Sequence, residues 1–359
     1  MRGCREDFPL IVHNADIVIA GGGMVGAALA CALSGNGLSI LVVEKQEPQL
    51  AWPEDEIDLR VSAINHASQH LLENIGAWED IRSRGIQAYR QMRVWDQLSM
   101  GDIHFDSAAI GEADLGHIIQ NRAIQAALWE RMRACADITL LTPAVITLMD
   151  HEADSVSLLL DDGSRISCRL AVAADGANSR LRDMAGIGVD VHDFEQFGLV
   201  ATVGTPRGHM ETAWQRFLPN GPLAFLPVSP THCSIVWSTT DDESQQLLAM
   251  STDDFCSALN NASEGRLGTI LCDDRRARFP LRSQHAGSYL ADRLVQHTEK
   301  ALREAKETTT WAHPDAEVEE AAAAFASALV ADWTRRDPAI SRQLERSDPL
   351  GDGGRLSRR

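Results

Sequence analysis

The sequence predicts an α/β protein that begins with a Rossmann-like domain, and two observations support this fold class. Between Ala15 and Lys45, an apolar strand, a glycine loop, a helix and a second apolar strand follow one another. Farther along, from about Gly186 to Tyr289, residues alternate as in antiparallel strands, with Asn-Gly and Ser-Pro turn signals between them. We therefore expect a nucleotide-binding domain and a second, β-rich domain.

The glycine loop fits the pattern G-x-G-x-x-G at Gly21, Gly23 and Gly26. The first glycine allows a tight turn, the second lets a pyrophosphate approach the backbone, and the third lets the helix lie close to the strand. The helix predicted from Met24 to about Leu33 directs its free N–H groups at the loop, where an anion is favoured. Glu44 ends the second strand, and its carboxylate can accept hydrogen bonds from a ribose hydroxyl.

The alternative interpretation of this loop is a glycine-rich turn that binds no ligand. The flanking strands, the helix and the terminal acid are the context that favours binding of an adenosine diphosphate group. The motif alone does not distinguish FAD from NAD.

Composition excludes several classes of function. A formal net charge of −18 argues against nucleic acid, whose phosphates most of the surface would repel. The seven cysteines form no C-x-x-C and have no histidine at zinc spacing, so we expect reduced, mostly buried thiols and no metal. No apolar run is long enough to span a bilayer, and the first 14 residues do not resemble a secretory signal. We expect a cytoplasmic protein, soluble or peripheral on a membrane.

Two segments in the middle of the chain carry candidate phosphate-binding residues. Arg60 comes shortly after the strand that ends in Glu44. Gln120 and Arg122 lie where a strand ends and an amphipathic helix begins. The alternative for an arginine at a helix start is a solvated surface charge.

A third segment, "RLAVAADGANSRLRDMAGI", places Asp175 and Gly176 directly after an apolar strand. The carboxyl ends of parallel strands are where open α/β sheets bind ligands, and a glycine lets the ligand come near the backbone. The alternative is an Asp-Gly turn in which Ser179 caps the next helix. The spacing D-G-x-x-S-x-x-R favours ligand binding.

With these segments in view, the chain resembles the class A flavin-dependent aromatic hydroxylases, and more narrowly the ubiquinone-biosynthesis 2-polyprenylphenol hydroxylases. The resemblance is carried by "VIAGGGMVGAALA", "LRVSAINHAS", "LGHIIQNRAIQAALWE", "ADGANSRLR", "GPLAFLPVS" and "CSIVWS". These segments occur in family order from about Asp16 to Val295.

The resemblance implies FAD in an extended conformation, with NAD(P)H as co-substrate. Gly21, Gly23, Gly26 and Glu44 would hold the adenosine part. Arg60, Gln120 and Arg122 would lie along the phosphates and the ribityl chain, and Asp175 with Gly176 would serve both FAD and NAD(P)H. Phe225 and Pro227 would lie where the substrate sheet faces the flavin. The expected domains are 15–185 for FAD, with a short β insertion near 88–116, and 186–295 for the substrate.

The implied reaction hydroxylates a polyprenylated phenol or quinol with molecular oxygen, through a C4a-hydroperoxyflavin. The chemistry is the cofactor's, so no protein nucleophile is required and we name no catalytic residue. Such a substrate implies peripheral contact with the inner membrane, and other quinone-biosynthesis proteins as partners.

Two other groups of residues have simpler explanations. His66 and His70 are four positions apart on a predicted helix, but their polar neighbours suggest a solvent-exposed helix face rather than a metal site. Trp95, Trp129 and Trp237 lie in apolar runs, which favours core packing over stacking on a flavin.

After Val295 the chain departs from the family pattern, which calls for Gly-Asp-Ala-Ala-His and a glycine-rich loop. Residues 296–359 instead predict an alanine- and glutamate-rich helical segment and a disordered end. We interpret this tail as a truncation or a shifted reading frame rather than a replacement domain. Two functions therefore remain open: a flavin monooxygenase, or a non-catalytic remnant that acts as a nucleotide-binding or assembly subunit.

Overall fold

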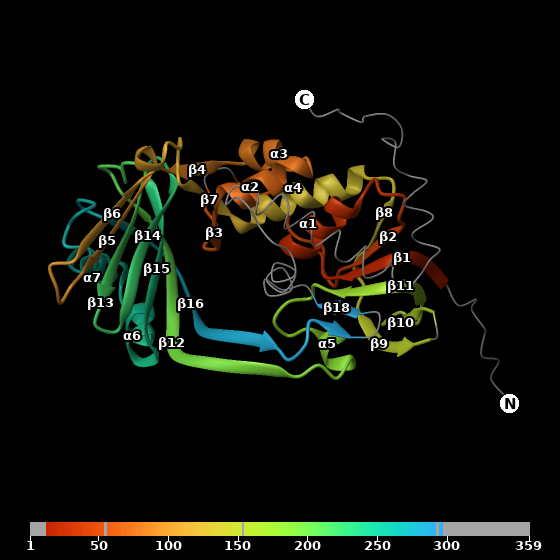
Figure 1. Ribbon diagram of the computed structural model, residues 1–359. Helices are drawn as coiled ribbons and strands as arrows, with labels where there is room; N and C mark the ends of the chain where they lie inside the picture. Colours follow the sequence, from red (N-terminus) through yellow and green to blue (C-terminus); the bar gives the residue numbers. More distant parts are fainter. Residues whose placement is uncertain (1–11, 54–55, 153, 292–293, 297–359) are drawn as a thin grey trace, which may run out of the picture. The chain divides into compact units, whose positions relative to one another are not determined.

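The computed structural model describes residues 12–53, 56–152, 154–291 and 294–296 (Figure 1). The chain forms two compact units, each assembled from separate stretches of sequence. Among the described residues, unit 1 contains 12–47, 129–188, 288–291 and 294–296, and unit 2 contains 48–53, 56–128 and 189–287. The division at 15–185, 186–295 and 296–359 stays a prediction, and the predicted tail lies outside the described residues except for Gln296.

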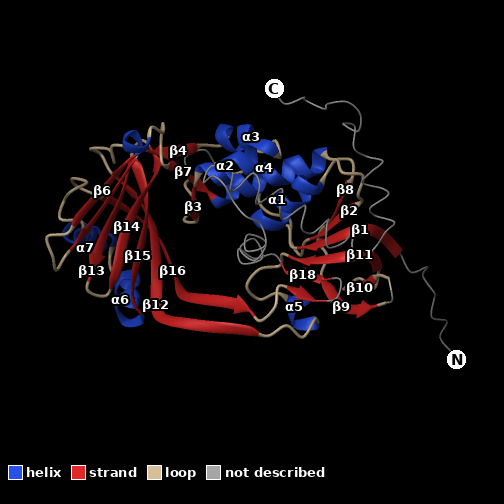
Figure 2. Ribbon diagram, viewed as in Figure 1, coloured by secondary structure: helices blue, strands red, loops and turns tan. Residues whose placement is uncertain are grey.

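Unit 1 is built on a mostly parallel sheet (Figure 2). Its parallel strands, in spatial order, are β18 (Leu294–Gln296), β11 (Arg165–Ala173), β1 (Val12–Ala20), β2 (Ile40–Val43) and β8 (Ile138–Leu141). Antiparallel strands extend the sheet on the side of β11 that also carries β18: β10 (Val156–Leu160) pairs with β11, β9 (Ile146–His151) pairs with β10, and β17 (Leu290–Ala291) pairs with β18. The glycine loop thus follows a central strand.

The predicted strand, loop, helix and strand of unit 1 are confirmed. Ile17, Val18 and Ile19 are fully buried, as expected of a central parallel strand with apolar side chains on both faces. Helix α1 (Met24–Leu33) begins at the loop and ends before Gly35, which has φ +84°. The other helices that contribute to unit 1 are the second half of α4 (Asn121–Ala134) and α5 (Arg180–Met184).

Unit 2 contains a large antiparallel-rich sheet of seven strands (Figure 2). Their spatial order is β16 (Leu271–Ala286), β12 (Val189–Gly204), β15 (His232–Thr240), β14 (Gly221–Ser229), β13 (Thr212–Leu218), β5 (Gln91–Asp96) and β6 (Asp102–Asp106). Strand β5 pairs with β13 in parallel, so the β insertion expected near 88–116 extends this sheet. The antiparallel strands β13, β14 and β15 confirm the alternation seen in the sequence.

A three-stranded sheet and several helices complete unit 2. The small sheet has the order β3 (Val61–Ile64), β7 (Gly116–Gln120) and β4 (Ile86–Tyr89). The helices are α2 (His66–Asn74), α3 (Trp78–Ser83), the 3-10 turn η1 (Ser107–Ile110), the first half of α4, α6 (Asp241–Ala249) and α7 (Thr252–Ala262). Leu247 of α6 and Phe255 and Leu259 of α7 pack against one face of the large sheet and form its core.

Candidate functional site

The glycine loop of unit 1 is shaped by two glycines that the fold itself requires. Gly21 has φ +101°, and a Cβ there would lie 2.3 Å from the carbonyl oxygen of Ala174. A Cβ on Gly26 would lie 2.0 Å from the carbonyl oxygen of Gly21. Gly23 differs, because a Cβ there would meet no atom within 4 Å. The glycine at the start of α1 is therefore not needed for packing, and the space beside it is open to a ligand.

Glu44 holds the glycine loop from the end of β2. One of its carboxylate oxygens, Oε2, accepts a hydrogen bond of 2.7 Å from the backbone N–H of Gly22. The carbonyl oxygen of Gly22 accepts a second bond of 2.7 Å from the indole N–H of Trp129. Trp129 is fully buried, and Trp95 and Trp237 are also buried, so the prediction of core packing for these tryptophans is confirmed.

The two carboxylate oxygens of Asp175 differ, because one is hydrogen-bonded within the fold and the other is not. Its Oδ2 accepts a hydrogen bond of 2.7 Å from the backbone N–H of Arg180, at the start of α5. Ser179 is the N-cap of that helix and accepts from the N–H of Arg182, as the alternative interpretation expected. The second oxygen, Oδ1, is buried and has no hydrogen-bond partner among the described residues. This oxygen is free to accept a hydrogen bond from a ligand hydroxyl.

These features of unit 1 fit a dinucleotide such as FAD. The open space at Gly23 lies at a helix N-terminus, where a pyrophosphate is favoured. The unpartnered oxygen of Asp175 can accept a hydrogen bond from a sugar or ribityl hydroxyl. The roles of individual residues toward FAD stay predictions.

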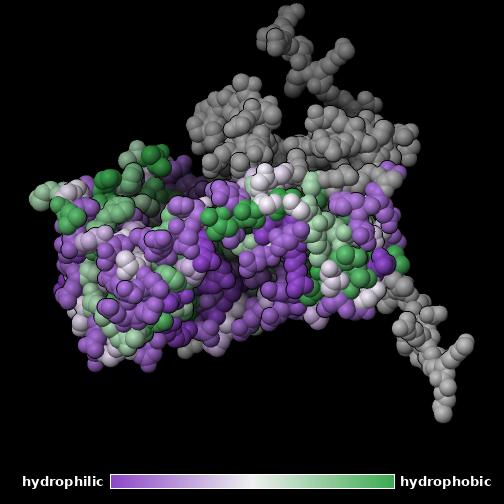
Figure 3. Space-filling model, turned by 90° about the horizontal axis from the view of Figure 1, so that it is seen from below, coloured by the Kyte–Doolittle hydropathy of each residue, from purple (hydrophilic) through white to green (hydrophobic). Residues whose placement is uncertain are grey.

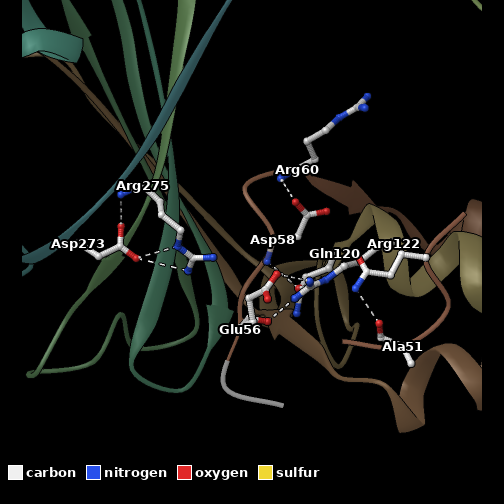
Figure 4. Close-up of polar contacts among 9 residues, drawn as sticks. Ala51, Glu56, Asp58, Arg60, Gln120, Arg122, Asp273 and Arg275 are labelled. Carbon is white, nitrogen blue, oxygen red and sulfur yellow. Dashed lines mark hydrogen bonds and ion pairs between the residues drawn. The ribbon is translucent and has the colours of Figure 1, made fainter. Parts of the chain in front are cut away.

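In unit 2 the structure brings Gln120 and Arg122 together (Figure 4). Gln120 Oε1 accepts hydrogen bonds from the backbone N–H of Asp58, at 2.8 Å, and from Nε of Arg122, at 3.1 Å. Arg122 also donates to the carboxylate of Glu56 over 2.7 Å and to the Glu56 carbonyl oxygen. The Trp52 ring lies 4.5 Å from the Arg122 guanidinium carbon. Arg122 is therefore held by the chain that precedes β3.

Arg60 does not join this group. Its side chain is exposed and points away from Gln120 and Arg122 (Figure 4). Within the described ranges its guanidinium makes no hydrogen bond or ion pair, whereas its backbone N–H donates to Asp58 over 3.3 Å. Arg60 is thus a free cation for a phosphate or another anion.

The large sheet of unit 2 forms the floor of a cavity with a volume of about 1060 Å³. The segment 56–61 and Asn121 line it on one side, and β12, β15 and β16 supply the rest of its lining. From the sheet, the uncharged lining residues are Val200, Ser234, Val236, Ala277 and Phe279. These residues lie on the sheet face opposite to α6 and α7, because their strand neighbours Leu199, Ile235 and Trp237 pack in the core.

Phe225 and Pro227 occupy the core side of β14. Phe225 is fully buried and packs with the cluster that includes Leu247 and Phe255. Pro227 alternates with it and is also buried. The cavity face of β14 carries Ala224 and Leu226 instead, since these residues pair with Val236 and Ser234 of β15. None of these four residues is among those that line the cavity, and the role of Phe225 and Pro227 toward a substrate stays a prediction.

Sequence reasoning missed the segment 51–58 and the place of Ser234 in the cavity lining. The partners of Arg122 lie far from it in the sequence, so no local spacing of residues predicts these contacts. Ser234 had a usable signal, because strict alternation in "CSIVWS" places Ser234 and Val236 on one face and Cys233 and Ile235 on the other.

The cysteines and histidines of the described part of the chain form no disulfide and no group of metal ligands. Its six cysteines are all free, three of them buried, and burial raises the pKa of Cys31, Cys168 and Cys233 to about 12. His66 bonds to Asp114 over 2.8 Å, and no cluster of three or more metal-ligating side chains exists among these residues. None of the described helices has the length and apolar character needed to cross a bilayer.

Comparison with known proteins gives a consistent picture. A family model described as an FAD binding domain matches residues 14–296. The chain is 34% identical over 280 residues to the 3-demethoxyubiquinol 3-hydroxylase of Escherichia coli, covering 78% of this chain and 71% of that protein. It is 36% identical over 281 residues to the ubiquinone hydroxylase UbiL of Rhodospirillum rubrum, covering 78% and 65%. The chain thus spans about two thirds of the length of these relatives.

The fold has a clear structural counterpart as well. A crystal structure of a mutant of PqsL from Pseudomonas aeruginosa superposes with a TM-score of 0.71, over 93% of this chain and 91% of that one. The sequence identity is 20%, so this likeness concerns the fold alone.

Proposed function

Because the chain belongs to the FAD-binding family that contains the ubiquinone-biosynthesis hydroxylases, we propose that it is an FAD-dependent monooxygenase. It hydroxylates the aromatic ring of a polyprenylated phenol or quinol and uses NAD(P)H and molecular oxygen. The observation that carries the proposal is the glycine loop of unit 1, with open space at Gly23 and an unpartnered buried oxygen on Asp175.

The residues of unit 1 have defined tasks in this proposal. The N–H groups at the start of α1 bind the pyrophosphate beside Gly23. Asp175 Oδ1 accepts a hydrogen bond from a hydroxyl of the cofactor, while Oδ2 stays on the Arg180 N–H. Bound FAD supplies the redox chemistry with NAD(P)H and oxygen, which no amino-acid side chain provides.

The cavity over the large sheet of unit 2 binds and orients the substrate. The cavity of about 1060 Å³ has room for an aromatic ring and part of a prenyl chain. Its floor is largely apolar, which excludes water from the ring and holds it in one orientation.

Arg60, Gln120 and Arg122 are assigned to the phosphates and ribityl chain of the cofactor. Of these three side chains, only that of Arg60 has no partner among the described residues.

A peripheral membrane contact accompanies this function, since a polyprenylated substrate resides in the bilayer. Large apolar side chains are exposed on the hairpin of β5 and β6 and around it: Leu98, Met100, Ile103, Phe105 and Ile110. The face of the molecule in Figure 3 is mostly hydrophilic, with local hydrophobic areas. We assign the β5–β6 hairpin to the membrane surface.

The alternative function is a non-catalytic subunit that keeps the fold and a nucleotide site. It is favoured by one observation: Arg122 is already hydrogen-bonded to Glu56 and stacked near the ring of Trp52. The two functions differ in what they require of the cofactor, because only the hydroxylase must bind FAD and reduce it.

The absorption spectrum of the purified full chain tests the proposal. We expect a flavin band, FAD in the supernatant after denaturation, and NAD(P)H oxidation that increases when a prenylated phenol is added. A chain that binds ADP but neither retains nor takes up FAD would support the non-catalytic subunit instead.

A further inference from the structure

Helix α7 and the beginning of strand β16 contact each other along one line. Thr252, Cys256 and Asn260 are spaced four residues apart, so they lie on one face of α7. At one end of this line, Thr252 donates a hydrogen bond to the carboxylate of Asp274. At the other end, Asn260 Oδ1 accepts a hydrogen bond of 3.0 Å from the backbone N–H of Ile270. The helix and the strand therefore run beside each other in opposite directions.

This arrangement places two thiols opposite each other. Cys256 is midway between the two helical residues that make these contacts, and Cys272 is midway between their two partners on the strand side. Cys256 Sγ donates to the carbonyl oxygen of Ile270 over 2.8 Å, two residues before Cys272. Both cysteines pack against the same hydrophobic cluster, and a hydrogen bond joins their side chains.

The surroundings of the pair differ from those of the other thiols. Both side chains are half-buried and are accessible to a small oxidant, in contrast to the three buried cysteines of the described chain. Arg276 brings a positive charge close to Cys272, and this charge favours a thiolate. Its guanidinium is fixed by hydrogen bonds to the carbonyl oxygens of Leu247 and Met250, over 3.0 and 2.7 Å. The cation therefore stays beside the pair.

The two thiols have different parts in an oxidation. Burial, together with the hydrogen bond and the charge of Cys256, raises the pKa of Cys272 and outweighs the attraction of Arg276. A thiol that keeps its proton is a poor nucleophile, because the thiolate is the reactive form. Cys256 is therefore the thiol that meets the oxidant first, and Cys272 is the thiol that completes the bond.

We propose that Cys256 and Cys272 form a redox site, in which hydrogen peroxide converts the two thiols into a disulfide that joins α7 to β16. The sulfur of Cys256 attacks one peroxide oxygen, the O–O bond breaks, and water leaves while Cys256 becomes a sulfenic acid. The sulfur of Cys272 then attacks the sulfenic sulfur, and the hydroxyl group leaves as water with the Cys272 proton. The two sulfurs together lose two electrons to the peroxide oxygens. No cofactor takes part, so the site is independent of the proposed function.

The disulfide acts on the part of β16 that borders the cavity. Between Cys272 and Arg276 this strand shifts register relative to β12, so residues 273–275 form a bulge. Asp274 and Arg275 of the bulge line the cavity. A covalent link at Cys272 fixes the strand where the bulge begins. Oxidation therefore restrains this side of the cavity lining.

Peptide mapping of the full chain tests the site. The reduced protein is treated with hydrogen peroxide, and the remaining thiols are alkylated under denaturing conditions. Trypsin and a glutamate-specific protease then separate Cys233 from Cys256, and mass spectrometry identifies the peptides. A parallel sample contains dimedone, which labels sulfenic acids. The variants are Cys256→Ser and Cys272→Ser, and the matched control is Cys135→Ser, which removes a half-buried cysteine outside the pair.

We expect a product in which the peptides of Cys256 and Cys272 are joined with the loss of two hydrogen atoms. It should exceed every other cysteine pair by at least about tenfold, because these two thiols are already in contact, and dithiothreitol should remove it. The Cys135→Ser protein should form the same product, whereas neither serine variant of the pair should. In Cys272→Ser, dimedone should label Cys256, because its sulfenic acid has lost the second thiol.

Two results would overturn the redox site. One is full alkylation of Cys256 and Cys272 in the peroxide-treated unmodified chain, and the other is a disulfide that forms as readily between other cysteines. Both are measured on the unmodified chain, so a variant that fails to fold does not affect them. The FAD content of the same preparation is measured separately, and failure to bind FAD would refute the proposed function without changing the result for the thiols.

Discussion

Arg122 donates a hydrogen bond to the carboxylate of Glu56, with 2.7 Å between its Nη1 and Oε1. The side chain of Arg122 is only 13% exposed, and the Trp52 ring lies 4.5 Å from its guanidinium carbon. The arginine assigned to the cofactor phosphates is therefore held by an acid of the preceding segment. FAD and Glu56 are expected to compete for it.

Replacing Glu56 with glutamine should strengthen FAD binding. Glutamine keeps a hydrogen-bond acceptor for Arg122 but removes the competing charge, so Arg122 is released more readily to a phosphate. An ion pair of this kind contributes about 0.2 to 1 kcal/mol when exposed and more when partly buried, so we expect FAD affinity to increase by about three- to tenfold. Quenching of flavin fluorescence during titration measures the change.

The matched control is Glu79→Gln, which breaks the exposed ion pair of Glu79 with Arg82 at 2.6 Å. This variant should bind FAD as the unmodified chain does. If Glu56→Gln also leaves FAD affinity unchanged, Arg122 does not face the cofactor.

Substituting Gly23 with valine should abolish binding of adenine nucleotides while leaving the fold intact. A side chain at this position meets no protein atom within 4 Å, and the residue has φ −66°, which valine can adopt. The branched side chain then occupies the space that a pyrophosphate needs. Equilibrium dialysis with ADP measures binding, and the melting temperature reports on the fold.

Gly188→Val is the control for this experiment, because a Cβ on Gly188 also meets no atom within 4 Å, but Gly188 belongs to the link between α5 and β12 and not to the glycine loop. It should bind ADP normally. Normal ADP binding by a folded Gly23→Val protein would remove the glycine loop from the nucleotide site.

Asp175→Asn should weaken FAD binding by at least tenfold. The amide oxygen can still accept from the Arg180 N–H at the start of α5, but an NH₂ group replaces the buried acceptor Oδ1. A ligand hydroxyl then loses its acceptor. Asp106→Asn is the control, since Asp106 likewise accepts from a backbone N–H, that of Ala108 at 2.9 Å. FAD affinity that falls equally in both variants would point to a general effect of the substitution.

The double substitution Leu98→Asp with Met100→Asp should reduce binding to lipid vesicles. Leu98 is 81% exposed and Met100 is fully exposed, so the changes cost little stability. Flotation with liposomes of neutral and anionic lipid measures the effect. Leu148→Asp serves as the control on β9, where the side chain is 44% exposed. Equal flotation of all three proteins would place the membrane contact elsewhere.

The nucleotide-binding half of the fold could be predicted from sequence because its signals are local. The strand at Ile17–Ile19, the helix from Met24 to Leu33 and the strand Ile40–Val43 are each visible as apolar runs bounded by glycine. The order of loop, helix and acid then follows from chain connectivity alone.

The substrate side could not be predicted to the same depth, because it depends on contacts between distant strands. The cavity-lining neighbours Val200 and Val236 are 36 positions apart, and only the pairing of β12 with β15 brings them together. Arg122 is likewise 66 residues from Glu56. Phe225 illustrates the same limit, since its strand was predicted from the sequence but its burial in the core beside α6 and α7 was not.

The central claim is that this chain transfers oxygen to a prenylated phenol with FAD as its cofactor. Incubating the FAD-loaded full chain with NAD(P)H, ortho-prenylphenol and isotopically labelled oxygen gas, followed by mass spectrometry of the product, tests it most directly. The account predicts a hydroxylated ring that carries one labelled oxygen atom, and no labelled product from the Gly23→Val protein. Stable FAD binding and NAD(P)H oxidation without any labelled product would contradict it.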